Sequence, residues 1–206
     1  MGRNKTVTWV RLATTRAGRI GLAASENGLV LSSLPGGHPE SGDRQERTNR
    51  FVPHPTKPPE KVARVLDDAE RALSAYYSQW PHWPGEEIGL LWDDLTGLPV
   101  DLEGLTSFSR KVLLLLRQVP PSMVISYGAL AARAGSPRAA RAVGAILARN
   151  PLPIILPCHR VIAADGTLGG FSGGRRDAAL RLKDSLLRYE GWTLGRDGEL
   201  AANPGY

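Results

Sequence analysis

Apolar and polar residues alternate along the first part of the chain with the two-residue period of half-buried β-strands. The apolar positions are Val7, Trp9 and Val10, then Ile20 and Leu22, and then Leu29 to Leu31. Asn27-Gly28 indicates a two-residue hairpin turn, because both central positions of such a turn favour residues that tolerate positive φ. Residues 6–33 are therefore predicted to form a three-stranded meander.

A helical repeat replaces the strand pattern at Glu60. Apolar side chains then recur at three- and four-residue spacing, which predicts an amphipathic helix that covers the meander. This apolar face is made by Val62, Val65, Leu66, Ala69, Leu73 and Tyr76. Residues 35–59 are rich in Pro, Gly, Arg and His, and we expect an exposed and partly disordered loop there.

Residues 77–99 are again rich in Pro and Gly and are predicted to be a linker. We place the domain boundary inside this linker. Residues 1–90 are then an N-terminal α/β domain made of the meander and the helix. Residues 91–206 are a mostly helical C-terminal domain.

Three helices are predicted in the second domain. The first covers residues 108–119, with Ser107 as its N-cap and two prolines at its end. The second lies between Ser126 and Gly135, and the third runs from Ser136-Pro137 to Arg149. Two helices joined by so tight a turn are typical of a helix-turn-helix, which we expect to be of the winged type.

The third helix has two different faces. Val143, Ile146 and Leu147 share one side. The opposite side mixes arginines with alanines, namely Arg138, Arg141, Ala142, Ala145 and Arg149. Such a face is positively charged and thin, which favours a helix that enters the minor groove of double-stranded DNA and holds phosphates. The alternative is an ordinary solvated basic face.

The single cysteine of the chain, Cys158, directly precedes His159 and Arg160. The short apolar run Ile154–Leu156 is predicted to be a buried strand that Pro157 stops, so that the thiol lies at a strand end. A nucleophilic thiol needs a base or a positive field beside it, and the two following residues offer both. The alternative is a cysteine buried as a small hydrophobe.

The string Pro157-Cys158-His159-Arg160-Val161 follows Asn150-Pro151 and precedes Gly169-Gly170-Phe171-Ser172-Gly173-Gly174. These residues resemble the active site of the O6-alkylguanine-DNA alkyltransferases, also called methylated-DNA–protein-cysteine methyltransferases. The resemblance extends from about residue 108 to 191 and, more weakly, over the N-terminal part. It implies direct DNA repair by a single-turnover methyltransferase. A methyl or small alkyl group would pass from O6 of guanine, and from O4 of thymine, to the cysteine after nucleotide flipping.

The resemblance also assigns catalytic roles. His159 would take the thiol proton of Cys158 through a water, and Glu190 would orient the imidazole. Tyr127 would aid nucleotide rotation and donate a hydrogen bond to guanine N3. Asn150 would brace the turn that carries the nucleophile.

Binding roles follow from the same resemblance. The flipped base would be held by the backbone carbonyls of Cys158 and Val161, the backbone N–H of Ser172 and the apolar wall of Phe171. Arg141 would fill the space that the flipped nucleotide leaves. The remaining residues expected at the DNA are Arg138, Ala139, Ala140, Ala142, Gly144 and Tyr127. The chain departs from the family pattern at residues 175–182, an extra segment before Lys183, and by having phenylalanine at 171.

Net charge and cysteine content agree with these expectations. The formal charge of +6 suits a polyanionic partner. One cysteine excludes an internal disulfide and a cysteine-rich zinc site, and we expect no metal and no cofactor. No stretch reaches the ~20 apolar residues of a membrane helix. We therefore expect a soluble cytoplasmic monomer with no membrane partner, and clustering of several copies on DNA stays open.

Two other functions stay open at this level. One is a non-catalytic binder of alkylated DNA, although such proteins replace the nucleophile that this chain retains. The other is a helix-turn-helix regulator with a redox-sensing or methyl-responsive cysteine, although no separate activation domain is apparent.

Overall fold

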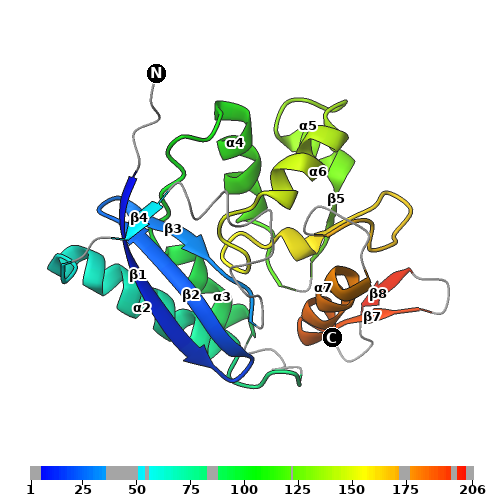
Figure 1. Ribbon diagram of the computed structural model, residues 1–206. Coiled ribbons are helices and arrows are strands. Elements are labelled where there is room, and N and C mark those ends of the chain that lie inside the picture. The colour runs from blue at the N-terminus through cyan, green and yellow to red at the C-terminus, as the bar shows by residue number, and fades with distance from the viewer. Residues whose placement is uncertain are drawn as a thin grey trace. The chain divides into compact units, whose positions relative to one another are not determined.

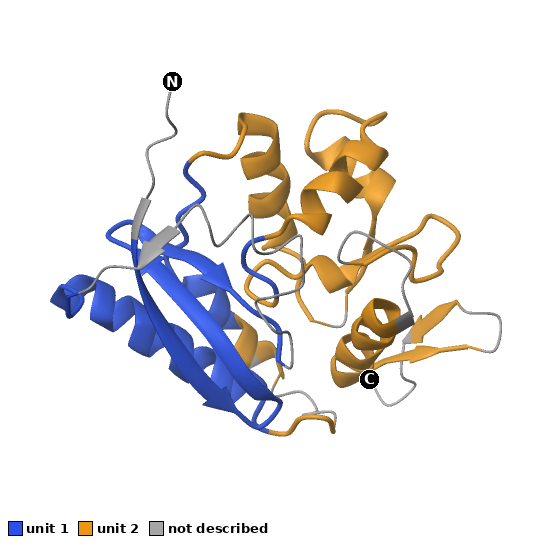
Figure 2. Cartoon of the chain, in the orientation of Figure 1, with its two compact units in different colours: residues 1–78, 93–103, 151–153 blue, residues 79–92, 104–150, 154–206 orange. Residues whose placement is uncertain are grey.

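The computed structural model describes residues 6–35, 51–53, 56–82, 88–121, 123–171, 177–195 and 199–202. The chain divides into two compact units (Figure 2). Unit 1 comprises residues 1–78, 93–103 and 151–153, and unit 2 comprises residues 79–92, 104–150 and 154–206. The predicted boundary is a single cut between residues 90 and 91. In the structure, residues 93–103 and 151–153 belong to unit 1 although they follow that cut.

The sheet of unit 1 contains the predicted meander (Figure 1). Strands β1 (Thr6–Thr15), β2 (Gly18–Ser25) and β3 (Gly28–Ser32) pair antiparallel, which confirms the prediction. A fourth strand, β4 (Phe51–Pro53), pairs parallel with β1 at the edge. The predicted loop over 35–59 is wrong at these three residues, because the open edge of β1 offers backbone groups for pairing. Residues 36–50 and 54–55 lie outside the described part of the chain.

The β2–β3 hairpin turns at Glu26–Asn27, one residue earlier than predicted, because Ser25 pairs with Gly28. Gly28 has φ 141°, and a Cβ atom there would lie 2.7 Å from the carbonyl of Pro99. The N–H of Leu29 donates to that same carbonyl at 2.9 Å. The glycine is thus required by the close approach of a second backbone as well as by its own φ.

Helix α2 (Glu60–Tyr76) has the predicted bounds and packs on β1, β2 and β3. Its buried residues are those of the predicted apolar face, with Ala72 in addition. The predicted linker over 77–99 is wrong, because helix α3 (Ile88–Gly97) forms within it. Ile88, Trp92 and Leu95 are buried at four- and three-residue spacing, a helical repeat that the Pro- and Gly-rich surroundings conceal.

Unit 2 contains the three predicted helices, α4 (Ser107–Leu116), α5 (Tyr127–Arg133) and α6 (Ala140–Ala148), which pack on one another. The N-cap of α4 is Thr106 and not Ser107, because the Thr106 hydroxyl accepts the Ser109 N–H at 3.2 Å. Helix α5 begins and ends as predicted, with Ser126 as N-cap and Gly135 at φ 85°.

Helix α6 begins later than predicted. Residues 136–139 form a turn in which the Ala139 N–H donates to the Ser136 carbonyl, and Ala139 is the N-cap. On the predicted inner face of α6, Val143 and Leu147 are buried and Ile146 is partly buried. Its arginine- and alanine-bearing side is exposed at residues 138, 141, 142, 145 and 149.

A helix and a hairpin form the end of unit 2. Helix α7 (Asp177–Tyr189) is followed by a hairpin of β7 (Trp192–Leu194) and β8 (Leu200–Ala202). Thr167 forms an antiparallel bridge with Glu199, so the hairpin pairs with the turn that precedes Gly169. Backbone pairing thus orders a segment with little apolar content. None of the helices in the described part of the chain is long and apolar enough to span a bilayer.

Candidate active site

The segment that carries Cys158 is a series of turns and not the predicted strand at Ile154–Leu156. Ile154 has φ 75°, and the carbonyl of Leu156 accepts both the Asn150 side-chain N–H at 2.6 Å and the Cys158 N–H at 2.8 Å. These bonds fold the backbone back on itself, and the flanking prolines offer no N–H for a strand ladder. Asn150 therefore makes the contact that its predicted bracing role requires.

Cys158 begins a short 3-10 helix, η2 (Cys158–Arg160), which leads into strand β6 (Val161–Ile162). Strand β6 pairs parallel with β5 (Ile125–Ser126), and the residue after β5 is Tyr127. This two-stranded ribbon therefore joins the start of α5 to the residues that follow the thiol.

His159, Arg160 and Glu190 form one buried network. His159 Nε2 and Glu190 Oε1 are 2.9 Å apart. Arg160 donates from Nε to Glu190 Oε2 at 2.8 Å and from Nη2 to Glu190 Oε1 at 2.6 Å. Arg160 Nη1 donates to the backbone carbonyl of Val119. The side chains of all three members are at most 1% exposed.

The network fixes the protonation of its members. Burial opposes ionisation of Glu190, but the charges and hydrogen bonds of Arg160 and His159 outweigh it and hold the pKa of Glu190 well below its usual range. Burial lowers the pKa of His159 despite the opposing effect of Glu190, so the imidazole is neutral at neutral pH. An ionised carboxylate only accepts, so Nε2 carries the proton and Nδ1 is the acceptor.

Lys183 is a member of the site that sequence reasoning missed. Its buried Nζ donates to the carbonyls of Val161 and Leu168 at 2.5 Å each and to that of Gly170 at 3.3 Å. Burial lowers the pKa of Lys183 to about 8, against the raising effect of a charged Cys158. Helical spacing could have placed Lys183 on the buried face of α7, because Leu186 and Leu187, three and four residues later, are buried.

Tyr127 lies beside the same turn. Its hydroxyl donates to the Gly170 carbonyl at 2.9 Å. Burial raises the pKa of Tyr127, and the charge of Cys158 raises it further. Gly169, at φ 65°, lies so close that a Cβ atom would be 3.3 Å from the Tyr127 ring, and on Gly144 a Cβ atom would be 3.9 Å from it.

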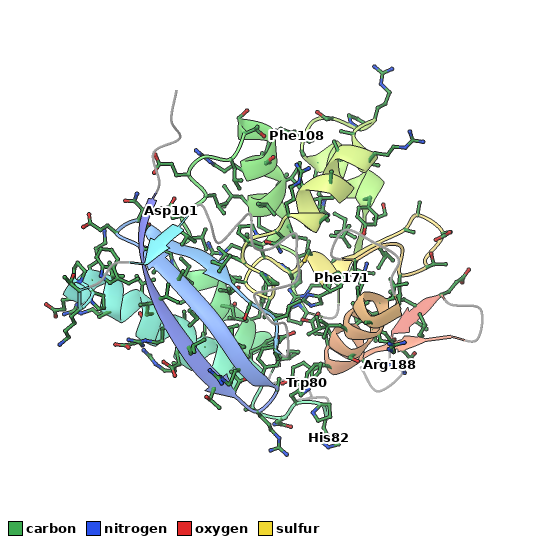
Figure 3. The ribbon with its side chains drawn as sticks, in the orientation of Figure 1. Trp80, His82, Asp101, Phe108, Phe171 and Arg188 are labelled. Atoms are coloured by element: carbon green, nitrogen blue, oxygen red, sulfur yellow. The ribbon has the colours of Figure 1, made fainter. Side chains whose placement is uncertain are left out.

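The other predicted base contacts are only partly described. Phe171, labelled in Figure 3, is buried. The carbonyls of Cys158 and Val161 each accept one donor already, from the Val161 N–H and from Lys183. A carbonyl oxygen has two lone pairs and can accept two hydrogen bonds. Ser172 lies outside the described residues.

The predicted DNA contacts lie on α6 and the turn before it. Arg138, Arg141 and Ala142 are exposed, while Ala139, Ala140 and Gly144 are partly buried. Within the described ranges, no three His, Cys, Asp or Glu side chains are grouped so that they could hold a metal ion.

Known proteins resemble this chain in sequence and in structure. The family described as "6-O-methylguanine DNA methyltransferase, DNA binding domain" matches residues 107–192. The methylated-DNA–protein-cysteine methyltransferase of Rattus norvegicus is 37% identical over 180 residues, which are 87% of this chain and 80% of that protein. The chain belongs to the methylated-DNA–protein-cysteine methyltransferase family. The human relative of that name is 50% identical over 93 residues, 45% of this chain and 42% of its own length.

The family assignment extends to solved structures. The Mycobacterium tuberculosis O6-methylguanine methyltransferase has a TM-score of 0.60 and 30% identity, covering 89% of this chain and 92% of its own. The Mycobacterium tuberculosis OGT in complex with DNA has a TM-score of 0.58 and 27% identity, covering 90% of this chain and 92% of its own. These solved structures support the predicted combination of an N-terminal three-stranded antiparallel sheet and helices.

Proposed function

We propose that this protein repairs DNA directly, by irreversible transfer of a methyl or small alkyl group from O6 of guanine to Cys158. The observation that carries the proposal is the buried hydrogen bond between His159 and Glu190, which is 2.9 Å long. His159 directly follows Cys158, the only cysteine of the sequence. O4 of thymine presents the same kind of alkyl ether and is the second substrate that we propose.

The first step activates the thiol. His159 takes the proton of Cys158 through a water, by the acceptor nitrogen Nδ1, while Nε2 stays bonded to Glu190. The imidazolium that forms is stabilised by the Glu190 carboxylate. The resulting thiolate lies in the field of the Lys183 ammonium, which favours the charged form.

The second step transfers the alkyl group. A bond forms between Sγ and the alkyl carbon while the bond from that carbon to O6 breaks, and the electron pair stays on the guanine. Tyr127, and the Ser172 N–H by resemblance to the family, stabilise the developing charge. The Tyr127 hydroxyl must then exchange its Gly170 partner for N3 of the base. The guanine regains a proton, and water does not cleave the thioether, so each molecule acts once.

Access to the base requires flipping. Guanine O6 is covered inside the base stack, and rotating the nucleotide out costs a few kcal/mol. We propose that α6 lies in the minor groove as part of a winged-type helix-turn-helix, and that Arg141 fills the vacated space. The exposed arginines of its outer face support phosphate contacts with little sequence preference. The binding species is a monomer, and clustering along DNA is open to measurement.

One experiment tests the proposed function. The protein is incubated with a duplex oligonucleotide that contains one O6-methylguanine, and the intact mass and the mass of the Cys158 peptide are measured. We expect a gain of one methyl group on that peptide. Tight binding without a mass change would identify a non-catalytic binder, and sequence-specific binding of undamaged DNA would identify a regulator.

A further inference from the structure

Two tryptophans from residues 79–92 contact the residues around Glu190. The rings of Trp80, labelled in Figure 3, and Tyr189 have centroids 5.2 Å apart and are tilted by 56°. The Cζ atom of Arg160 lies 3.9 Å from the centroid of the Trp92 ring. The segment that composition marks as a linker therefore contributes to the active centre of unit 2.

The contact with Trp92 adds an aromatic neighbour to the polar partners of Arg160. All three guanidinium nitrogens donate, two of them to Glu190 and one to the Val119 carbonyl. These bonds run along the edges of the planar group and limit its movement within the plane. The Trp92 ring, whose centroid lies 3.9 Å from the Arg160 Cζ atom, limits movement of the group toward the ring.

The attraction is stronger here than on a surface. Arg160 is fully buried and Trp92 is 6% exposed. A cation over an indole face gains most when both groups are desolvated. An aliphatic residue could fill the same space, but it would offer no attraction to the cation.

We propose that Trp92 is a positioning residue for the transfer reaction, and that its indole face holds the Arg160 guanidinium so that Glu190 keeps His159 in its productive orientation. The proposal rests on the proposed function. Glu190 Oε1 carries the coupling, because it accepts from both Arg160 Nη2 and His159 Nε2. A guanidinium that tilts takes the carboxylate with it and weakens the bond to the imidazole.

A change at Trp92 would alter the pKa of His159 through the charged groups that surround the imidazole. Glu190 raises the pKa of His159, while Arg160 and Lys183 lower it. A weaker bond to Glu190 leaves a poorer base, so Cys158 needs a higher pH to form its thiolate. A defect in packing alone would lower stability without this change in pH dependence.

The test compares Trp92→Leu with Trp92→Phe, which keeps an aromatic face. Single-turnover rate constants for methyl transfer from an O6-methylguanine duplex are measured as a function of pH, together with DNA affinity. We expect Trp92→Leu to react about tenfold more slowly at neutral pH, the scale of a lost buried cation–π contact. Its rate should recover at alkaline pH, and its DNA affinity should not change. Trp92→Phe should retain most of the rate.

A matched control is Trp9→Leu, which removes a buried indole from unit 1. It should lower the Tm and leave the pH profile as in the wild type. Equal losses of rate in Trp92→Leu and Trp92→Phe, or wild-type rates in both, would overturn the positioning role.

Nitrogen NMR of His159 decides the matter independently of transfer. We expect the Nε2–H signature in the wild type and in Trp92→Phe, and a mixture of tautomers in Trp92→Leu. An unchanged signature in Trp92→Leu overturns the inference even if the wild type transfers methyl. A wild type that takes up no methyl overturns the proposed function instead, and the NMR comparison still gives its own answer. If Trp92→Leu does not fold, Trp92→Met, a flexible side chain that also lacks an aromatic face, takes its place with the same expected outcomes.

Discussion

The buried residues of the two units differ in kind. In the described part of unit 1, the buried polar residues are hydroxyl side chains, namely Thr8, Thr15, Ser25 and Ser32. In unit 2 they are Asn150, His159, Arg160, Lys183 and Glu190. Burying a charge is costly unless partners surround it. The comparison teaches that, among the described residues, buried charges are found around Cys158, where they can act on a thiol.

The largest effect should come from removing the sulfur. Cys158→Ser keeps the volume and the surrounding charges but replaces the thiol with a much poorer nucleophile. We expect no methyl gain by intact mass and full retention of binding to an O6-methylguanine duplex. Methyl appearing on another residue of this variant would contradict the assignment of the nucleophile.

The next effect tests the buried ion pair against a surface one. Glu190→Gln leaves the Arg160 charge buried without its counter-ion, so we expect a loss of about 3–5 kcal/mol in the free energy of unfolding, measured with denaturant. The matched control is Asp68→Asn on α2, whose partner Arg71 is exposed. Its unfolding midpoint should hardly move. Similar losses in both variants would remove the distinction between the units.

A pH titration sharpens the comparison through Lys183. The pKa of this lysine is lowered from 10.5 to about 8. Between these values the unfolded chain binds a proton that the folded protein has released, so the free energy of unfolding rises with pH. The slope is at most about 1.4 kcal/mol per pH unit.

Lys183→Met has no such proton to release and should lack this rise. The measurement is the wild-type minus variant difference in unfolding free energy at each pH. The pKa of Tyr189, raised to about 12 by burial, gives an opposite trend above about pH 10, but both proteins contain Tyr189 and the difference removes that trend. A flat difference between pH 8 and 10 would mean that the ammonium is not desolvated.

The smallest expected effect concerns the exposed side of α6. Arg141→Ala should weaken duplex binding about tenfold and reduce the slope of log affinity against log salt by about one. Unfolding should be unaffected, because the side chain is exposed. Arg64→Ala on α2 removes an exposed arginine from unit 1 and should change neither quantity. An equal salt response of both variants would speak against α6 as the DNA-binding helix.

Local patterns predicted unit 1 well. The meander and the buried face of α2 follow from periods of two and of 3.6 residues, and each is decided by residues close together in the chain. Helix α3 escaped prediction because prolines and glycines around it suggested a linker, although Trp92 and Leu95 carry a helical spacing.

Long-range contacts decided the site, and local patterns could not supply them. Ile154–Leu156 has the composition of a strand, but Asn150 captures the Leu156 carbonyl and the chain turns instead. The local sequence suggests that Lys183 is a solvated helix residue, whereas in the structure its Nζ donates to three backbone carbonyls. Glu190 was expected only by resemblance to the family, since 30 residues separate it from Arg160.

The β5–β6 ribbon restricts where this chain can change in length. Ile125 is paired with Val161 and Ser126 with Ile162 in a parallel register. One residue inserted between Ile125 and Ser126 would put Ser126, the N-cap of α5, on the opposite side of the ribbon, because each added residue reverses the side of a strand on which a side chain emerges. Design that varies loop length in this protein should therefore leave both strands of the ribbon, and the residues that follow them, uninterrupted.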